Sequence, residues 1–176
     1  LAGITAKYGI AGLQLATPEF RDKHAKWLSA RQQPDGGFAN RRGKSELYYT
    51  AFALRSLSAL GALSEQIAKR AAAYLRALLQ QDDKVLAKQP HGAFCDAVAA
   101  ASWWNSRTLC EEAAGMFFRN EDVLRAKEIT LARLTRLRRD DGGWAKTDRD
   151  GCGSLYHAFL AACVFAELNL QRIPGA

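Results

Sequence analysis

Proline, methionine and histidine are scarce in this 176-residue chain, which has four prolines, one methionine and three histidines. Few prolines and few β-branched residues, against abundant alanine and leucine, favour helix along almost the whole sequence. The longest apolar stretches, such as 97–104, fall far short of the roughly 20 residues that cross a membrane. We therefore predict an all-α protein without a membrane span. Residues 1–15 lack the features of a signal peptide, so we expect the cytoplasm as its location.

Cysteine pairs of the C-x-x-C type are absent, although the chain has four cysteines, namely Cys95, Cys110, Cys152 and Cys163. We expect reduced thiols, because a helical domain of this length does not need disulfides. The net charge of +7 suits an anionic partner, but no aromatic-interleaved basic motif accompanies it. Nucleic acid is therefore not an expected partner, and the basic residues also fit a solvated helix face.

Nearly the same sequence motif occurs twice in the chain, as Asp35-Gly-Gly-Phe38 and as Asp141-Gly-Gly-Trp144. Each lies between a charged amphipathic segment and an apolar segment. Asp-Gly favours a turn, and paired glycines allow positive φ angles that other residues resist. A weaker copy without the Asp-Gly-Gly lies about midway, at 94–101. The implied period of roughly 50 residues is typical of paired-helix repeats.

This pattern predicts about three helical hairpins in a single domain over residues 1–176. The amphipathic first helices are expected at residues 18–32, 64–81 and 120–138, and the nearly all-apolar second helices at 46–60, 92–105 and 154–168. A further short helix is expected at 107–118. Because a helix that is apolar all round is buried on every side, the second helices would form an inner layer inside the first.

The phrase around Asp35-Gly-Gly-Phe38, with the Tyr-Thr-x-x-Ala-Leu helix that begins at Tyr49, resembles a known repeat. This repeat is shared by protein prenyltransferase β-subunits and squalene/terpene cyclases. The sequence of the motif is also similar to that of prenyltransferase-like bacterial proteins of the planctomycete type. The likeness covers most of residues 18–170 and implies an α/α toroid. A complete toroid has about six hairpins, so this chain would be about half of one. A missing C-terminal half or self-association would then complete the ring.

The resemblance implies a domain that binds an isoprenoid or other hydrophobic ligand and, as its activity, the transfer of a prenyl group from a diphosphate. Arg41 and Lys44 stand at the family's offsets for the two basic residues that contact the diphosphate. They also fit an exposed basic loop. Asp150 and Cys152 match the family's Asp-x-Cys pair, which implies a zinc cofactor that holds an acceptor thiol as thiolate. Their other interpretation is a helix-capping aspartate and a buried thiol.

Alignment of the apolar helices places Thr50, Asp96 and His157 at the same position. Asp96 and His157 are therefore candidate catalytic residues, as an acid/base pair or, together with Cys95, as a metal site. A polar pair that ties two helices together would give the same pattern. The candidate aromatic residues for lining a hydrophobic ligand site, which would equally serve as plain core, are Tyr48, Tyr49, Phe52, Phe94, Trp103, Trp104, Tyr156 and Phe159.

Two other functions fit the same sequence. One is a non-catalytic helical repeat module that binds a protein partner, or its own second half, through an exposed repeat edge. The other is a fragment of a terpene-cyclase-like enzyme whose acid motif lies outside the chain, since no Asp-x-Asp-Asp sequence is present.

Overall fold

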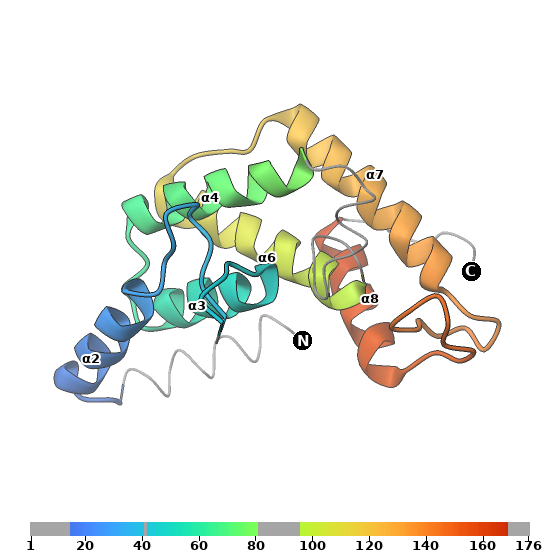
Figure 1. The fold of residues 1–176 in the computed structure, drawn as a ribbon, viewed down its shortest axis with the longest axis horizontal. Helices are drawn as coiled ribbons and strands as arrows, with labels where there is room; N and C mark the ends of the chain where they lie inside the picture. The colour runs from blue at the N-terminus through green and yellow to red at the C-terminus, as the bar shows by residue number, and fades with distance from the viewer. Residues whose placement is uncertain (1–14, 41, 81–95, 169–176) are drawn as a thin grey trace. The chain divides into compact units, whose positions relative to one another are not determined.

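The computed structural model describes residues 15–40, 42–80 and 96–168. Within these ranges the secondary structure is helical, with only isolated β-bridges beside it, and the predicted all-α class is confirmed (Figure 1). The helices are α2 (Pro18–Ser29), α3 (Leu47–Ala59), α4 (Glu65–Leu79), α6 (Ala97–Ala114), α7 (Asn120–Leu137) and α8 (Leu155–Glu167). None of these described helices is long and apolar enough to cross a membrane.

The chain divides into two compact units. Unit 1 comprises Leu1–Leu75 and Ser106–Phe117, and unit 2 comprises Arg76–Asn105 and Phe118–Ala176. Helices α4 and α6 therefore contribute residues to both units. A single domain over residues 1–176 stays a prediction, and each unit is described here by itself.

Most predicted helices begin and end within a few residues of their predicted bounds. Thr17 caps α2 by accepting a hydrogen bond from the Phe20 N–H at 3.2 Å. Helix α3 is followed by Gly61, whose φ of 68° allows the Ala62 N–H to donate to the Leu57 carbonyl at 2.8 Å. These ends follow from the local sequence, as expected.

The expected break near residue 105 does not occur. Residues predicted as the end of one helix (92–105) and as a separate helix (107–118) form the single helix α6 up to Ala114. Asn105 and Ser106 are weak helix formers, but neither prevents the backbone hydrogen bonds of a helix as proline would. The helix ends instead just before Gly115, which has a φ of 57°.

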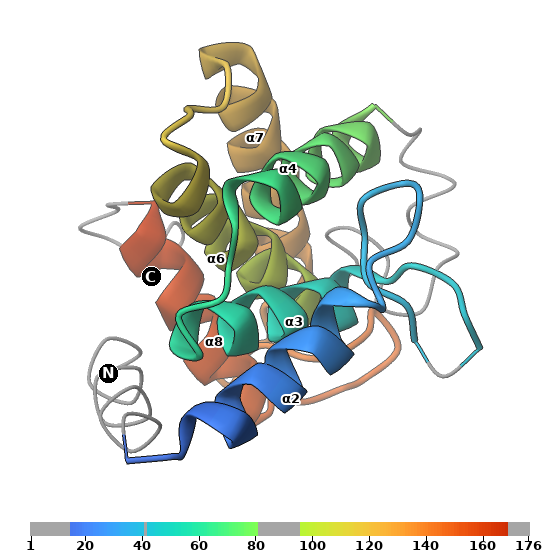
Figure 2. The ribbon, with the colours of Figure 1, turned by 90° about the vertical axis from the view of Figure 1, so that its left-hand side faces the viewer.

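In unit 1, helix α3 has one buried face, which includes Leu47, Ala51 and Leu54. Helices α2 and α3 lie side by side (Figure 2). The opposite face of α3 is not covered, because the side chains of Tyr49 and Phe52 are 38% and 49% exposed. The expectation that an all-apolar helix is buried on every side is therefore wrong for α3.

In unit 2, the core is built around two tryptophans of α6. The Trp103 and Trp104 rings are 5.1 Å apart, edge to face, and Trp103 also packs on Phe118 at 5.7 Å. The Trp104 indole N–H donates to the buried Thr130 hydroxyl of α7 at 3.1 Å. This bond gives the buried Trp104 indole N–H an acceptor inside a mostly apolar cluster.

Candidate functional site

The first Asp-Gly-Gly segment forms a tight turn over residues 33–37, which we name the first turn. The Gly36 N–H donates to the Gln33 carbonyl at 2.9 Å, and the Gln33 N–H donates to the Gly37 carbonyl at 2.8 Å. Gly36 has a φ of 91°, where a glycine is favoured. The Asp35 carboxylate accepts hydrogen bonds from the Gly37 N–H at 3.0 Å and the Ser45 hydroxyl at 2.7 Å. Asp35 thus ties the turn to the loop that follows.

The second turn, residues 139–143, has the same hydrogen bonds. The Gly142 N–H donates to the Arg139 carbonyl and the Arg139 N–H donates to the Gly143 carbonyl, both at 2.9 Å. Gly142 has a φ of 82°. The Asp141 carboxylate accepts from the N–H groups of Gly143 and Gly153, both at 2.8 Å. These bonds lower the pKa of Asp141 below its usual value.

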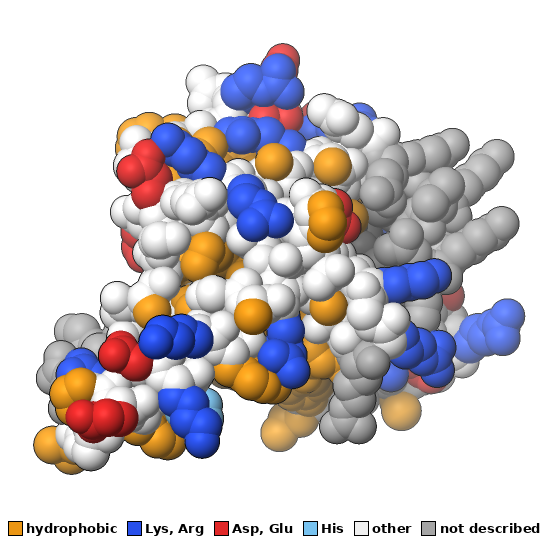
Figure 3. Space-filling model, turned by 60° about the vertical axis from the view of Figure 1, so that its left-hand side comes forward, with side chains coloured by type: hydrophobic (Ala, Val, Ile, Leu, Met, Phe, Trp, Pro, Cys, Tyr) orange, Lys and Arg blue, Asp and Glu red, His pale blue; other side chains and the backbone are white. Residues whose placement is uncertain are grey.

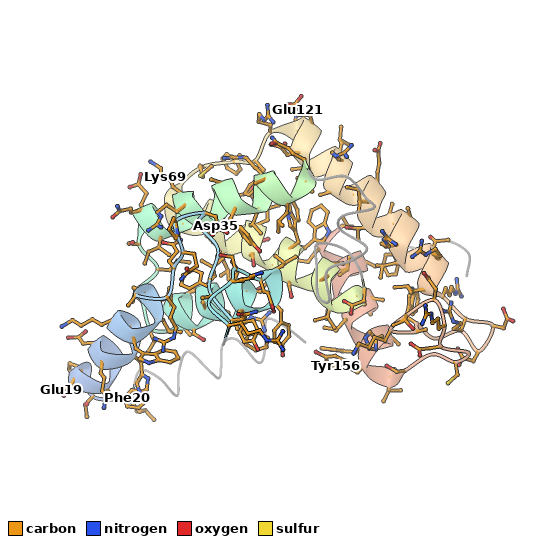
Figure 4. All side chains as sticks on the ribbon, viewed as in Figure 1. Glu19, Phe20, Asp35, Lys69, Glu121 and Tyr156 are labelled. Carbon is orange, nitrogen blue, oxygen red and sulfur yellow. The ribbon has the colours of Figure 1, made fainter. Side chains whose placement is uncertain are left out.

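The two turns differ in what covers them. The first turn packs against α4, where Gln32 Nε2 donates to the Ile67 carbonyl at 2.9 Å and the Arg70 guanidinium donates to the Gln33 carbonyl at 2.7 Å. Figure 4 labels Asp35 in this turn, beside α4. A Cβ atom on Gly36 would lie 2.0 Å from the Arg70 carbonyl oxygen. A Cβ atom on Gly142 would meet nothing within 4 Å, so the second turn is open at this point.

The buried tyrosine of α4 also belongs to the first turn's contact with that helix. Tyr74 is 8% exposed, and a Cβ atom on Gly37 would lie 3.0 Å from its ring. Burial, together with the negative charges of Asp35 and Glu46, raises the pKa of Tyr74 well above its usual range. Sequence reasoning missed Tyr74 and Arg70, because nothing in the sequence indicates which helix packs on a turn.

An aromatic face follows the first turn on α3. The Tyr48 ring lies 5.5 Å from the Tyr49 ring and 4.8 Å from the Phe52 ring. The structure therefore brings together three of the predicted ligand-lining residues. Their rings are partly open to solvent, with Tyr48 the most covered of the three. We name these three residues the aromatic face of α3.

A basic loop leads into this helix. Asn40 shapes the loop by accepting hydrogen bonds from the N–H groups of Arg42 at 2.7 Å and Lys44 at 3.3 Å, and its amide donates to the Glu46 carboxylate. The side chains of Arg42 and Lys44 are exposed. Arg41, the other predicted diphosphate ligand, lies outside the described residues. Helix α3 itself begins at Leu47, and the side chain of its N-cap residue Glu46 makes no capping hydrogen bond.

The predicted zinc site is wrong. Among the described residues, no group of three or more His, Cys, Asp or Glu side chains could hold a metal ion. The Asp150 carboxylate instead accepts hydrogen bonds from the N–H of Thr147 at 2.8 Å and from its hydroxyl at 2.9 Å, which lowers the pKa of Asp150. Asp150 therefore closes a turn of its own loop. Cys152 is exposed on that loop, rather than buried as the other interpretation had it.

The predicted catalytic pair does not share a hydrogen bond. The buried Asp96 carboxylate caps α6 by accepting from the Ala99 N–H at 2.8 Å. The Nδ1 atom of the buried His157 lies 2.7 Å from the Ser154 hydroxyl, and its Nε2 atom has no hydrogen-bond partner in the described part of the chain. Each residue thus bonds at the start of its own helix. Their catalytic role stays a prediction.

Thr50 and His157 also differ by one helical position. The two turns lie 106 residues apart, from position 36 to position 142, but α3 and α8 begin 108 residues apart, at Leu47 and Leu155. Thr50 is the fourth residue of α3, whereas His157 is the third residue of α8. The extra length lies in the loop after the second turn. Burial nevertheless follows the alignment by residue type, because Thr50 and His157 are both buried, as are the pairs Leu54 with Ala161 and Leu57 with Val164.

The remaining predicted lining residues are not in one place. Trp103 and Trp104 belong to the core of unit 2, with 0% and 2% exposure. Tyr156, labelled in Figure 4 at the start of α8, is 56% exposed, as is Phe159 to 47%. Phe94 lies outside the described residues, as does Cys95.

Comparison of the chain with protein-family models, with curated proteins and with solved structures finds no match.

Proposed function

We propose that the chain is a prenyltransferase-like helical repeat domain that binds a ligand with an isoprenoid tail and an anionic head, and that the aromatic face of α3 holds the tail. The observation that carries this proposal is the direct succession, within unit 1, of an exposed basic loop, an uncapped helix start and three clustered aromatic rings. The resemblance of the first turn and its helix to the prenyltransferase repeat is the reason for an isoprenoid tail.

The aromatic face offers apolar surface that a tail would cover. Tyr49 and Phe52 stand one turn apart on α3, so an extended tail can contact both rings at once. Burial of apolar surface contributes about 25 cal/mol per Å², so each 100 Å² covered contributes about 2.5 kcal/mol. Two half-exposed rings can therefore supply several kcal/mol of binding free energy.

The head group would lie at the start of α3. The first N–H groups of a helix have no partner within it, and Glu46 supplies no side-chain cap. These N–H groups and the exposed Arg42 and Lys44 side chains favour an anion. The Glu46 carboxylate opposes it, but that carboxylate is engaged by the Asn40 amide. The positive charges of Arg42 and Lys44, together with about half a positive charge from the N–H groups at the helix start, exceed the one negative charge of Glu46.

The same features do not recur on α8. There Ser154 caps the helix, because its hydroxyl accepts a hydrogen bond from the His157 N–H at 3.2 Å. Helix α8 thus provides a matched negative control within the chain. The proposal concerns binding alone. Asp96 and His157 each bond at the start of their own helix, and their catalytic role stays a prediction.

Isothermal titration calorimetry with farnesyl diphosphate tests this proposal, with farnesol and inorganic pyrophosphate as separate ligands. Phe52→Ala is expected to weaken farnesyl diphosphate binding about tenfold, which corresponds to about 1.4 kcal/mol. The control Phe159→Ala removes an equally exposed ring from α8 and is expected to leave binding unchanged.

The head group is tested by Lys44→Ala, with the exposed Lys23 of α2 changed to alanine as the control. Lys44→Ala is expected to lower the affinity for farnesyl diphosphate. It is expected to leave the affinity for farnesol unchanged, because farnesol lacks the negative charge. Absence of farnesyl diphosphate binding, or equal losses in Phe52→Ala and Phe159→Ala, would contradict the proposal.

A further inference from the structure

Three Asp-Gly pairs occur in the chain, at Asp35-Gly36, Asp141-Gly142 and Asp150-Gly151. The first two belong to the first and second turns, and the third lies in the loop that follows the second turn. An Asp-Gly pair can rearrange chemically, because glycine has no Cβ atom to hinder its backbone nitrogen. That nitrogen attacks the carboxyl carbon of the preceding aspartate, and the peptide bond then moves to the aspartate side chain.

The three aspartate carboxylates are in similar surroundings. Asp35, Asp141 and Asp150 are all exposed, and each carboxylate accepts two hydrogen bonds. Exposed carboxylates also occur elsewhere on the molecule, as Figure 3 shows in red at its lower left, over α2. Neither exposure nor the bonding of the carboxylate therefore distinguishes one Asp-Gly pair from the others.

The three glycine nitrogens differ. The Gly36 N–H donates to the Gln33 carbonyl and the Gly142 N–H donates to the Arg139 carbonyl, both at 2.9 Å. The Gly151 N–H has no hydrogen-bond partner in the described ranges of the chain. A nitrogen whose N–H is bonded to a carbonyl must break that bond before it can turn and lose its proton. Only at Gly151 is this step not required.

The surroundings of Gly151 also leave room for the rearrangement. Gly151 is exposed, and a Cβ atom on it would meet nothing within 4 Å. A Cβ atom on Gly36, by contrast, would lie 2.0 Å from the Arg70 carbonyl oxygen. Gly142 is as open as Gly151, but its N–H is held within the second turn. Gly151 alone combines an open position with an N–H that no carbonyl holds.

We propose that Asp150-Gly151 is the site at which the folded protein forms isoaspartate, and that the two turn pairs keep their aspartates. The Gly151 nitrogen bonds to Cγ of the protonated Asp150 carboxyl, and a carboxyl oxygen leaves as water together with the carboxyl and N–H protons. The product is a cyclic imide. One water molecule then opens the imide at the Asp150 main-chain carbonyl carbon, so that the chain continues through Cγ. One water is lost and one is gained.

The loop around Asp150 suits the product. The Arg139 Nε atom donates to the Asp150 main-chain carbonyl oxygen at 2.6 Å, and the same guanidinium donates to the Thr147 carbonyl at 2.8 Å. In isoaspartate this Asp150 oxygen belongs to a free carboxylate, so the bond from Arg139 becomes charge-assisted and stronger. Because the loop is exposed, an isoaspartyl methyltransferase, which methylates that carboxylate, can reach it.

Incubation of the whole chain at mildly acidic pH, where more of each carboxyl is protonated, tests the proposal. Digestion and mass spectrometry with electron-transfer fragmentation locate the isoaspartate, and methylation by an isoaspartyl methyltransferase counts it. A parallel sample in urea is incubated until all three pairs contain isoaspartate, since unfolding removes the hydrogen bonds that separate them. The folded protein is expected to contain about fivefold or more isoaspartate at Asp150 than at Asp35 or Asp141, the factor that one hydrogen bond contributes.

Two variants test the atoms involved. Gly151→Ala places a Cβ atom beside the attacking nitrogen and is expected to reduce isoaspartate at Asp150 strongly. It should keep the wild-type circular dichroism spectrum, because the added atom meets nothing within 4 Å. Thr147→Val removes one of the bonds that hold the Asp150 carboxylate and is expected to make formation roughly fivefold faster.

Three results would overturn the proposal. One is folded protein with as much isoaspartate at Asp35 or Asp141 as at Asp150. Another is folded protein without isoaspartate at Asp150 when the sample in urea contains it. The third is an unchanged amount at Asp150 in Gly151→Ala. No ligand takes part in these measurements, so this proposal and the proposed function can fail separately.

Discussion

Replacement of Gly36 by alanine should destabilise the protein far more than the same change at Gly142. Both glycines have a positive φ, 91° and 82°, and an alanine there costs about 1–2 kcal/mol. At Gly36 the added Cβ atom would also lie 2.0 Å from the Arg70 carbonyl oxygen and 2.6 Å from its carbon. At Gly142 it would meet nothing within 4 Å. Both variants therefore have the backbone cost of alanine at a positive φ, and only Gly36→Ala also has the steric clash with Arg70.

The second cost can be worked from the contacts of the first turn. A backbone carbonyl in the middle of α4 cannot rotate away, so the turn must move off the helix. That movement stretches the bonds from Gln32 to Ile67 and from Arg70 to Gln33, each worth about 1 kcal/mol. Gly36→Ala is thus expected to lose about 3–4 kcal/mol of unfolding free energy, and Gly142→Ala about 1–2 kcal/mol.

Urea unfolding followed by circular dichroism measures this difference. Both variants should be unfolded at the same low protein concentration, about a few micromolar, so that any association affects them equally. The expected gap of about 2 kcal/mol corresponds to roughly 4–8 °C in a thermal scan of a chain of this size. Equal losses in the two variants would refute the docking of the first turn on α4.

Three further predictions concern single side chains. Because burial raises the pKa of Tyr74, the protonated phenol stabilises the fold; this stability is full below about pH 10, the ordinary pKa of tyrosine, and falls as pH rises further. Tyr74→Phe should therefore flatten the alkaline decline in urea unfolding free energy, and an unchanged decline would contradict this. Backbone hydrogen bonds lower the pKa of Asp141, so Asp141→Asn should reduce the loss of urea unfolding free energy on acidification below about pH 4, and an unchanged loss would contradict this. Thr130→Val removes the hydroxyl that accepts a hydrogen bond from the buried Trp104 N–H and should cost about 1 kcal/mol by urea unfolding; a loss within error would argue against this bond.

Much of the fold could be predicted because its signals are local. Helix composition, the Thr17 cap and the glycine after α3 fix where helices begin and end, and each acts over only a few residues. The Asp-Gly-Gly phrase likewise predicted two turns, and both have the same hydrogen bonds. The predicted boundary between residues 105 and 107 is wrong, because weak helix propensity at Asn105 and Ser106 is easily overridden by packing.

The candidate site was harder to predict because it depends on contacts between distant residues. Asp150 and Cys152 fit a two-residue motif, but the motif does not require further ligands nearby, and Asp150 bonds within its own loop. The sequence alone did not indicate which of the candidate aromatic residues are buried in the core and which are exposed. The structure separates them into buried core, such as Trp103, and half-exposed rings, such as Phe52. Periodicity indicates a face of a helix but not what covers it.

The most direct test of the proposed function is a ¹⁵N–¹H correlation spectrum of the labelled protein during titration with farnesyl diphosphate. Binding as proposed would shift the amide signals of Lys44, Tyr48, Tyr49 and Phe52 and leave those of Tyr156 and Phe159 in place. Signals that shift mainly on α8, or no shifts at saturating ligand, would contradict an isoprenoid site on α3.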